Sequence, residues 1–144
     1  GRESIIARSM TETDIAELLS WPYTNVSSDG GLNGRHPRGY GSFTRVLGRH
    51  VRERGELSLE SAIRKMSSLA AENTGLSERG EIREGYFADL VLFDAETVLD
   101  RATPDEPNLT SVGVVGVWVN GARVYSEEGV TGNRPGRVLR RGDN

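Results

Sequence analysis

The chain has 144 residues, 18 basic and 21 acidic side chains, a formal charge of −3 and no cysteine. The length is enough for one modest hydrophobic core, and the charge argues against a nucleic-acid-binding protein. The lack of cysteine excludes disulfides and thiolate metal ligands, and two histidines are too few for a self-contained histidine-rich metal site. No apolar run approaches the roughly 20 residues of a membrane span and no signal peptide is evident, so we expect a cytoplasmic protein.

The first 30 residues predict two short strands joined by a helix. Residues 4–7 form an apolar run typical of a buried strand, and Thr11 or Thr13 caps a helix that ends before Pro22. The segment YTNVSS at residues 23–28 predicts a second strand that ends at Asp29 and two glycines. This is a βαβ spacing with parallel strands, and ligands bind at the carboxyl ends of such strands.

Asp29 is therefore a candidate functional residue. Without further support, an Asp-Gly pair after a strand is more often a turn than a catalytic group. Asp29 is followed by a loop of glycines, arginines and a histidine, GGLNGRHPRGYG. Whether that loop belongs to a site cannot be decided from spacing alone, and both interpretations stay open at this point.

Two amphipathic helices are predicted next. Residues 41–54 carry apolar side chains at helical spacing, with His50 near the stripe as a packed or partly exposed helix residue and not as a ligand. The second helix is capped by Ser58 and ended by Gly75.

After Gly75 the pattern changes to strands. Residues 88–93 predict a strand, residues 95–111 a polar loop, and residues 112–129 a hairpin whose Asn120-Gly121 pair indicates a type I′ turn. The basic, turn-rich end of the chain predicts a disordered or loosely docked tail. The first half is thus α/β and the second half all β. Each half lacks strands needed to bury its sheet, and the chain starts at Gly1 without Met, so we expect missing sequence upstream.

Three stretches resemble one known family. SSDG followed by HPR-YGSF-RVLG, then LSLESAIRKMSSLAAENTGLSERGEIREGYFADLVLFD, then VWVNGARVY with RPGRVLR, are similar to the C-terminal end of the D-aminoacylases in the amidohydrolase superfamily. The resemblance implies the C-terminal end of a (β/α)₈ barrel, followed by the C-terminal part of a small β-sandwich. Residues 1–77 would form the barrel portion, and residues 78–144 the sandwich portion and tail.

The resemblance also implies roles for two residues. Asp29 matches the family's aspartate beside the zinc ion, a metal ligand that acts as general base on water and returns the proton to the leaving amine. Arg38 matches the arginine that grips the α-carboxylate of an N-acyl-D-amino acid, where bidentate binding helps to select the D enantiomer. The remaining zinc ligands would lie upstream of Gly1, so we expect no activity from this chain by itself.

Two alternatives stay open. A related amidohydrolase acting on other amides or cyclic amides would differ in the loop that carries Arg38. A non-catalytic remnant, or a module that completes the barrel of another chain, would also lack the histidines. The expected partners are a small-molecule substrate and the missing N-terminal part of the same protein, with neither nucleic acid nor a membrane.

Overall fold

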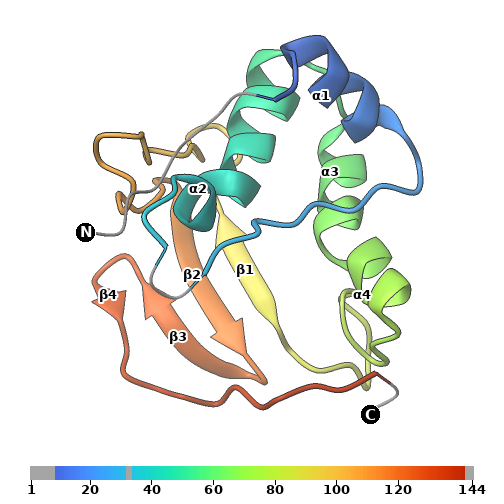
Figure 1. Ribbon diagram of the computed structural model, residues 1–144. Helices are drawn as coiled ribbons and strands as arrows, with labels where there is room; N and C mark the ends of the chain where they lie inside the picture. The colour runs from blue at the N-terminus through green and yellow to red at the C-terminus, as the bar shows by residue number, and fades with distance from the viewer. Residues whose placement is uncertain (1–8, 32–33, 142–144) are drawn as a thin grey trace.

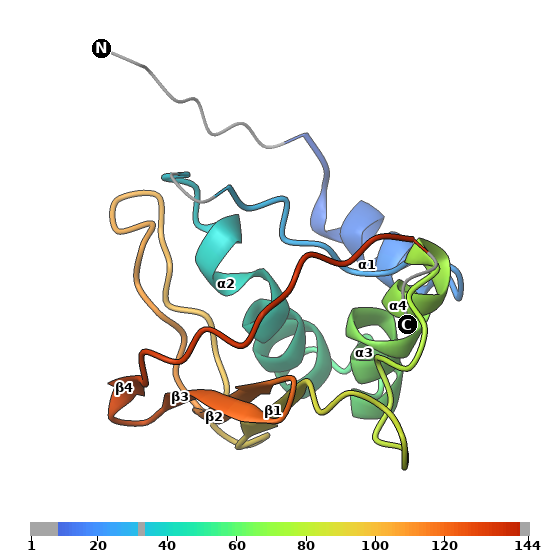
Figure 2. The ribbon, with the colours of Figure 1, turned by 90° about the horizontal axis from the view of Figure 1, so that it is seen from below.

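The computed structural model describes residues 9–31 and 34–141, so the predicted strand at residues 4–7 lies outside the described residues. Helices cover one face of a small antiparallel sheet, which Figure 2 shows edge-on. Within the described ranges, no helix is long and apolar enough to cross a membrane. The elements are α1 (Glu12–Ser20), α2 (Arg38–Arg45), the π-helix η1 (Val46–Glu53), α3 (Leu59–Met66), α4 (Ser68–Thr74), β1 (Leu90–Phe93), β2 (Val114–Val119), β3 (Ala122–Ser126) and β4 (Gly129–Val130).

Helix α1 begins where the sequence predicts. Thr11 accepts a hydrogen bond from the backbone N–H of Asp14, and the Asp14 carboxylate accepts one from the backbone of Thr11, which completes a capping box. The helix is joined to η1 through Glu12, whose carboxylate lies 2.6 Å from the Arg54 guanidinium and 3.4 Å from that of Arg49.

The helix predicted at residues 41–54 starts earlier and changes its winding. Helix α2 begins at Arg38 and continues directly into η1, a π-helix of eight residues. Gly48 lies in η1 against the next segment of chain, where an added Cβ would stand 2.8 Å from both the Val98 carbonyl oxygen and a Leu99 methyl group. The backbone of η1 therefore packs closer to this segment than any larger residue allows.

The next predicted helix is divided in two. Ser58 caps α3 by accepting a hydrogen bond from the N–H of Ser61, and Gly75 ends α4 in the left-handed conformation with φ of 72°. Both ends are as predicted, but the single continuous helix is not observed. Ser67, with φ of −132° and ψ of −90°, separates α3 from α4. The backbone of Gly80 packs against Ser67, a contact between distant residues that helical periodicity does not report.

The strand predicted at residues 23–28 is wrong for this chain. The segment is extended over residues 24–28, but none of its residues joins a sheet, and its Val26 N–H instead donates to the Lys65 carbonyl of α3 at 3.1 Å. A strand needs a neighbouring strand for its ladder, and the described part of the chain supplies none beside this segment. Figure 1 shows the segment crossing α3 between α1 and α2.

The second half forms a four-stranded antiparallel sheet in the order β1-β2-β3-β4. The predicted strand and hairpin are confirmed as β1, β2 and β3. Asn120 and Gly121 join β2 to β3 with φ of 47° and 80°, the two positive values that a type I′ turn requires.

Residues 131–135 are docked against the hairpin, which corrects the disordered or loosely docked tail expected for this part of the chain. Their N–H and amide groups bond to β3: the Thr131 N–H donates to the Val124 carbonyl at 3.0 Å, and the Asn133 amide donates to the Arg123 carbonyl at 2.8 Å. The Asn120 amide then holds the carbonyl of Pro135 at 2.7 Å. Figure 1 shows this last segment running past the sheet towards α4.

One hydrophobic core joins the two halves of the chain. Val46, Leu47 and Ala62 come from the helices, and Val98, only 1% exposed, comes from the loop after β1. Polar contacts reinforce this junction, because the Arg52 guanidinium donates to the carbonyl of Val98 at 2.7 Å.

Candidate functional site

Asp29 lies at the end of the extended segment, where the chain turns sharply. Its φ of 46° is left-handed, a conformation that aspartate tolerates better than most residues. The Asp29 side chain is 79% exposed, so solvent reaches its carboxylate. The turn is supported by hydroxyls: the N–H of Asp29 donates to the Ser27 side chain at 3.4 Å, and that of Gly30 to the Ser28 side chain at 3.3 Å.

Arg38, the other residue singled out from the sequence, contacts Asp29 directly. Its Nη2 lies 2.8 Å from Asp29 Oδ2, and its Nε donates to the Asp29 carbonyl oxygen at 3.1 Å. The guanidinium therefore holds both the side chain and the backbone of one residue. The Arg38 side chain is itself 49% exposed, so the two groups form a paired, solvent-accessible site.

The loop between Asp29 and Arg38 folds back on itself. A Cβ added to Gly30 would stand 2.7 Å from the Cα of Gly39, so these two backbones approach at a distance that only glycine permits at position 30. His36 lies in the loop, and its Nδ1 accepts a hydrogen bond from the Arg38 N–H at 3.2 Å. His36 thus helps to start α2, and we assign it no role as a ligand.

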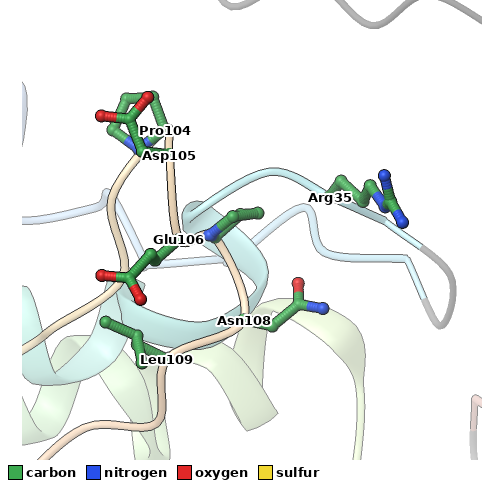
Figure 3. Close-up of a pocket in the computed structure, with 7 residues that line it drawn as sticks. Arg35, Pro104, Asp105, Glu106, Asn108 and Leu109 are labelled. Atoms are coloured by element: carbon green, nitrogen blue, oxygen red, sulfur yellow. The ribbon is translucent and has the colours of Figure 1, made fainter.

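A pocket of about 590 Å³ lies between this loop and the second half of the chain. Arg35 borders it on one side, and Figure 3 shows the polar loop standing opposite. That loop is attached to α2 through Ser111, whose hydroxyl lies 2.6 Å from that of Thr44 and donates to the Tyr40 carbonyl at 3.2 Å. The pocket is lined by Arg35, Pro104, Asp105, Glu106, Pro107, Asn108 and Leu109.

The described residues hold no complete metal site. Across residues 9–31 and 34–141, no three His, Asp or Glu side chains are grouped so that they could hold a metal ion. A catalytic zinc ion usually has three protein ligands. The carboxylate of Asp29 has the chemistry to be one of them. Any metal bound at Asp29 would need its other ligands from outside the described residues.

His50 is packed, as the sequence predicts. The residue is 5% exposed, and its Nδ1 lies 2.5 Å from a carboxylate oxygen of Glu56. This hydrogen bond is the main reason why the pKa of Glu56 is held below its usual value, with smaller contributions from Arg54. The His50–Glu56 pair lies at the end of η1. Within the described part of the chain, it shares no hydrogen bond or ion pair with Asp29 or Arg38.

Lys65 contacts the segment that leads to Asp29, and the sequence interpretation passed over it. Its Nζ donates to the Trp21 carbonyl and, at 3.1 Å, to the Thr24 carbonyl. Burial, and to a smaller extent the nearby Arg64, lowers the pKa of this ammonium group. A signal was present in the composition, since Lys65 is the single lysine among 18 basic residues.

Comparisons of sequence identify close relatives. A sequence model of the amidohydrolase family matches residues 6–125. The N-acyl-D-aspartate deacylase of Alcaligenes xylosoxydans xylosoxydans is 49% identical over 136 residues, covering 93% of this chain and 27% of the relative. The N-acyl-D-glutamate deacylase of the same organism is 47% identical, with 92% and 28% covered, and its D-aminoacylase is 45% identical, also with 92% and 28% covered.

Solved structures agree with this grouping. A crystal structure of D-aminoacylase has a TM-score of 0.87 at 45% identity, covering 92% of this chain and 28% of that one. The N-acyl-D-glutamate deacylase of Bordetella bronchiseptica, solved with zinc and a phosphonate inhibitor, has a TM-score of 0.84 at 50% identity, covering 91% and 28%. The chain spans slightly more than a quarter of the length of these relatives. With a matching sequence model over most of its residues and the same backbone as these deacylases, it belongs to the amidohydrolase family.

Proposed function

We propose that this chain is the C-terminal part of a zinc-dependent amidohydrolase that hydrolyses N-acyl-D-amino acids to a carboxylate and a free D-amino acid. The pairing of Asp29 with Arg38 in a chain of this family is the observation that carries the proposal. Residues 1–77 would belong to the barrel of the complete enzyme, and residues 78–144 to its β-sandwich and tail. The names of the three deacylase relatives support this substrate class.

Asp29 would serve as the general base and as a ligand of the metal. Zinc, when bound, supplies a Lewis acid that polarises the substrate amide and acidifies water. A carboxylate oxygen of Asp29 would accept the proton from the attacking water and then donate it to the nitrogen of the leaving amine. The exposure of this carboxylate and its strained backbone, with φ of 46°, suit a side chain that is presented to a substrate.

Arg38 would bind the α-carboxylate of the substrate. Its guanidinium already holds a carboxylate at 2.8 Å, so the geometry for such an ion pair is in place. A substrate carboxylate would replace Asp29 as the partner of Arg38, which frees the Asp29 carboxylate for proton transfer. Binding and chemistry would therefore be linked through one exchange of ion-pair partners.

The test joins this chain to the upstream part that its relatives possess. That part is taken either from the chain's own gene or from the Alcaligenes D-aminoacylase, in a chimera that replaces the matched segment. We expect zinc binding and hydrolysis of N-acyl-D-amino acids in the joined protein, and neither in the 144-residue chain alone. Asp29→Asn should lower kcat by about 100-fold to 10,000-fold, the usual worth of a general base. Glu128→Gln, an exposed acid in the turn between β3 and β4, is the control.

Each alternative predicts a different result. Hydrolysis of cyclic amides with no action on N-acyl-D-amino acids would replace the substrate class with that of a related amidohydrolase. Full activity of the Asp29→Asn variant would remove Asp29 from the mechanism. Zinc binding and turnover by the 144-residue chain would show that its ligands lie within this chain, and the assignment of upstream ligands would be wrong.

A further inference from the structure

The segment that carries Asp29 is held in place by one buried side chain. Lys65 lies on α3 and is 5% exposed, yet its ammonium group bonds to carbonyl oxygens of Trp21 and Thr24. The backbone carbonyl of the same lysine accepts the hydrogen bond from the Val26 N–H at 3.1 Å. Lys65 thus makes hydrogen bonds to three residues of the short stretch 21–26, which turns at residues 21–24 and then runs extended.

These hydrogen bonds fix the direction of the segment, as pairing with a neighbouring strand would in a sheet. Residues 23–28 lack a strand partner within the described chain, so their direction depends on contacts with α3 and α4. A second and exposed contact lies next to those of Lys65, where the Asn73 amide donates to the Asn25 side-chain oxygen at 3.0 Å. Asp29 follows Val26 by three residues, so any rotation of the segment moves the Asp29 carboxylate.

The chemistry of lysine fits this place better than that of arginine. The chain uses arginine at 17 of its 18 basic positions, and among the described residues most arginines are exposed or half-exposed. A compact ammonium group can donate to two carbonyls that converge on one point, whereas a planar guanidinium spreads its donors over a wider fork. Burying a cation is costly, and the two carbonyls compensate by replacing its water.

We propose that Lys65 is a positioning residue for Asp29: by fixing residues 21–26 on α3 it sets the place of the carboxylate three residues further on. This rests on the role proposed above for Asp29 as general base. Lys65 does not contact substrate and acts through the backbone alone. The consequence is a larger defect in the chemical step than in substrate binding, because the backbone of Arg38 belongs to α2 and its side chain alone contacts Asp29.

The experiment is a double-mutant cycle between Lys65→Met and Asp29→Asn in the joined protein described above. Lys65→Met should lower kcat by about 100-fold, the loss that a misplacement of roughly 1 Å can cause, while KM changes less than about threefold. The double variant should lose no more than Asp29→Asn alone, because a residue that acts through Asp29 has nothing left to position. Zinc content and the circular dichroism spectrum should match those of the parent.

Arg64→Met is the matched control. It removes a cation from the neighbouring position of the same helix, where Arg64 forms an exposed ion pair with Glu72 at 3.7 Å. Its kcat should stay within about twofold of the parent, since such pairs contribute little.

Failure of this inference is separable from failure of the proposed function. Losses that multiply in the double variant, or an unchanged kcat in Lys65→Met, would overturn the positioning role while leaving Asp29 as the base. An Asp29→Asn variant with normal kcat would overturn both. If Lys65→Met does not fold, Asn73→Ala decides: we expect a loss of about fivefold in kcat, the worth of one hydrogen bond, that disappears in the Asp29→Asn background. No loss, or a loss that persists in that background, would overturn the role.

Discussion

His50 and Glu56 bond to each other twice, once through their side chains at 2.5 Å and once through the backbone, where the Glu56 N–H donates to the His50 carbonyl at 2.8 Å. The two bonds join residues six positions apart and close the end of η1. Arg54 adds a contact to the same carboxylate at 3.4 Å and carries the connection on to Glu12 in α1. An ionised Glu56 is thus part of the link between η1 and α1.

The first prediction concerns acid stability. The His50 hydrogen bond lowers the pKa of Glu56 from its usual value of 4.5, so the folded state favours the ionised form. A carboxylate with a depressed pKa stabilises the fold above pH 4.5, and this contribution is lost as pH falls through the folded-state value. Thermal unfolding should be followed between about pH 3 and pH 7. We expect Tm to fall at the acidic end of this range, where Glu56 becomes protonated.

Glu56→Gln should flatten this dependence. The variant should have a lower Tm than the parent at pH 7 and a smaller difference from it at the acidic end, because the neutral amide has no proton to gain. Glu127→Gln, an exposed acid in the turn before β4, should leave the profile unchanged. Parallel Tm curves for the parent and Glu56→Gln would contradict a role for this carboxylate in acid stability.

The second prediction separates binding from chemistry at Arg38. Arg38→Lys in the joined protein should raise KM for N-acyl-D-amino acids by about 10-fold to 100-fold, because a lysine cannot form two parallel hydrogen bonds to a carboxylate. The value of kcat should change much less than in Asp29→Asn. A fall in kcat with unchanged KM would instead indicate that Arg38 acts on Asp29 and not on the substrate.

The same substitution should leave stability nearly intact. The Asp29 and Arg38 side chains are 79% and 49% exposed, and ion pairs at such exposure contribute about 0–1 kcal/mol. The Tm of Arg38→Lys should therefore lie close to that of the parent. A large drop would mean that this pair supports the fold, and any change in KM would then lose its simple meaning.

The third prediction tests the close packing of η1. Gly48→Ala should lower the free energy of unfolding by about 1–3 kcal/mol, since its Cβ would meet the Val98 carbonyl oxygen at 2.8 Å in a well-packed core. Gly136→Ala is the matched control, because an added Cβ there meets no atom within 4 Å. Denaturant unfolding of both variants gives the comparison, and equal stabilities would show that η1 can shift away from the loop at little cost.

The fourth prediction concerns Val98, which is 1% exposed in the shared core. Val98→Ala should lower the free energy of unfolding by about 2 kcal/mol, through lost burial and the cavity left behind. Val138→Ala, at a position 84% exposed, should change it by less than about 0.5 kcal/mol. Similar Tm values for the two variants would place the core elsewhere.

The features predicted correctly are those set by neighbouring residues. Thr11, Ser58 and Gly75 start or end helices through bonds within one turn, and the Asn120-Gly121 turn depends only on its own two residues. Asp29 and Arg38 are singled out as site residues through the resemblance to a family, and their direct contact was not predicted. Their ion pair depends on a loop that folds back through glycines, which no periodicity describes.

The features missed depend on contacts between distant segments. The break at Ser67 coincides with packing by Gly80, and the π-helical winding of η1 accompanies the approach of Gly48 to Val98. The segment at residues 23–28 has the composition of a strand, but its hydrogen bonds go to Lys65, a partner some 40 positions away. The composition of a segment indicates which secondary structure it favours. Whether a strand forms also depends on a neighbouring strand that can pair with it.

The core that joins Val98 to Val46 and Ala62 limits where recombination between related genes gives a well-packed protein. A genetic crossover between relatives near residue 77 would pair helices from one parent with a loop from the other, and the mismatch would fall in the most buried layer. Recombinants that keep residues 46–98 from a single parent avoid it. This stretch should therefore pass between related genes as one block, and a library of shuffled relatives would recover few viable crossovers within it.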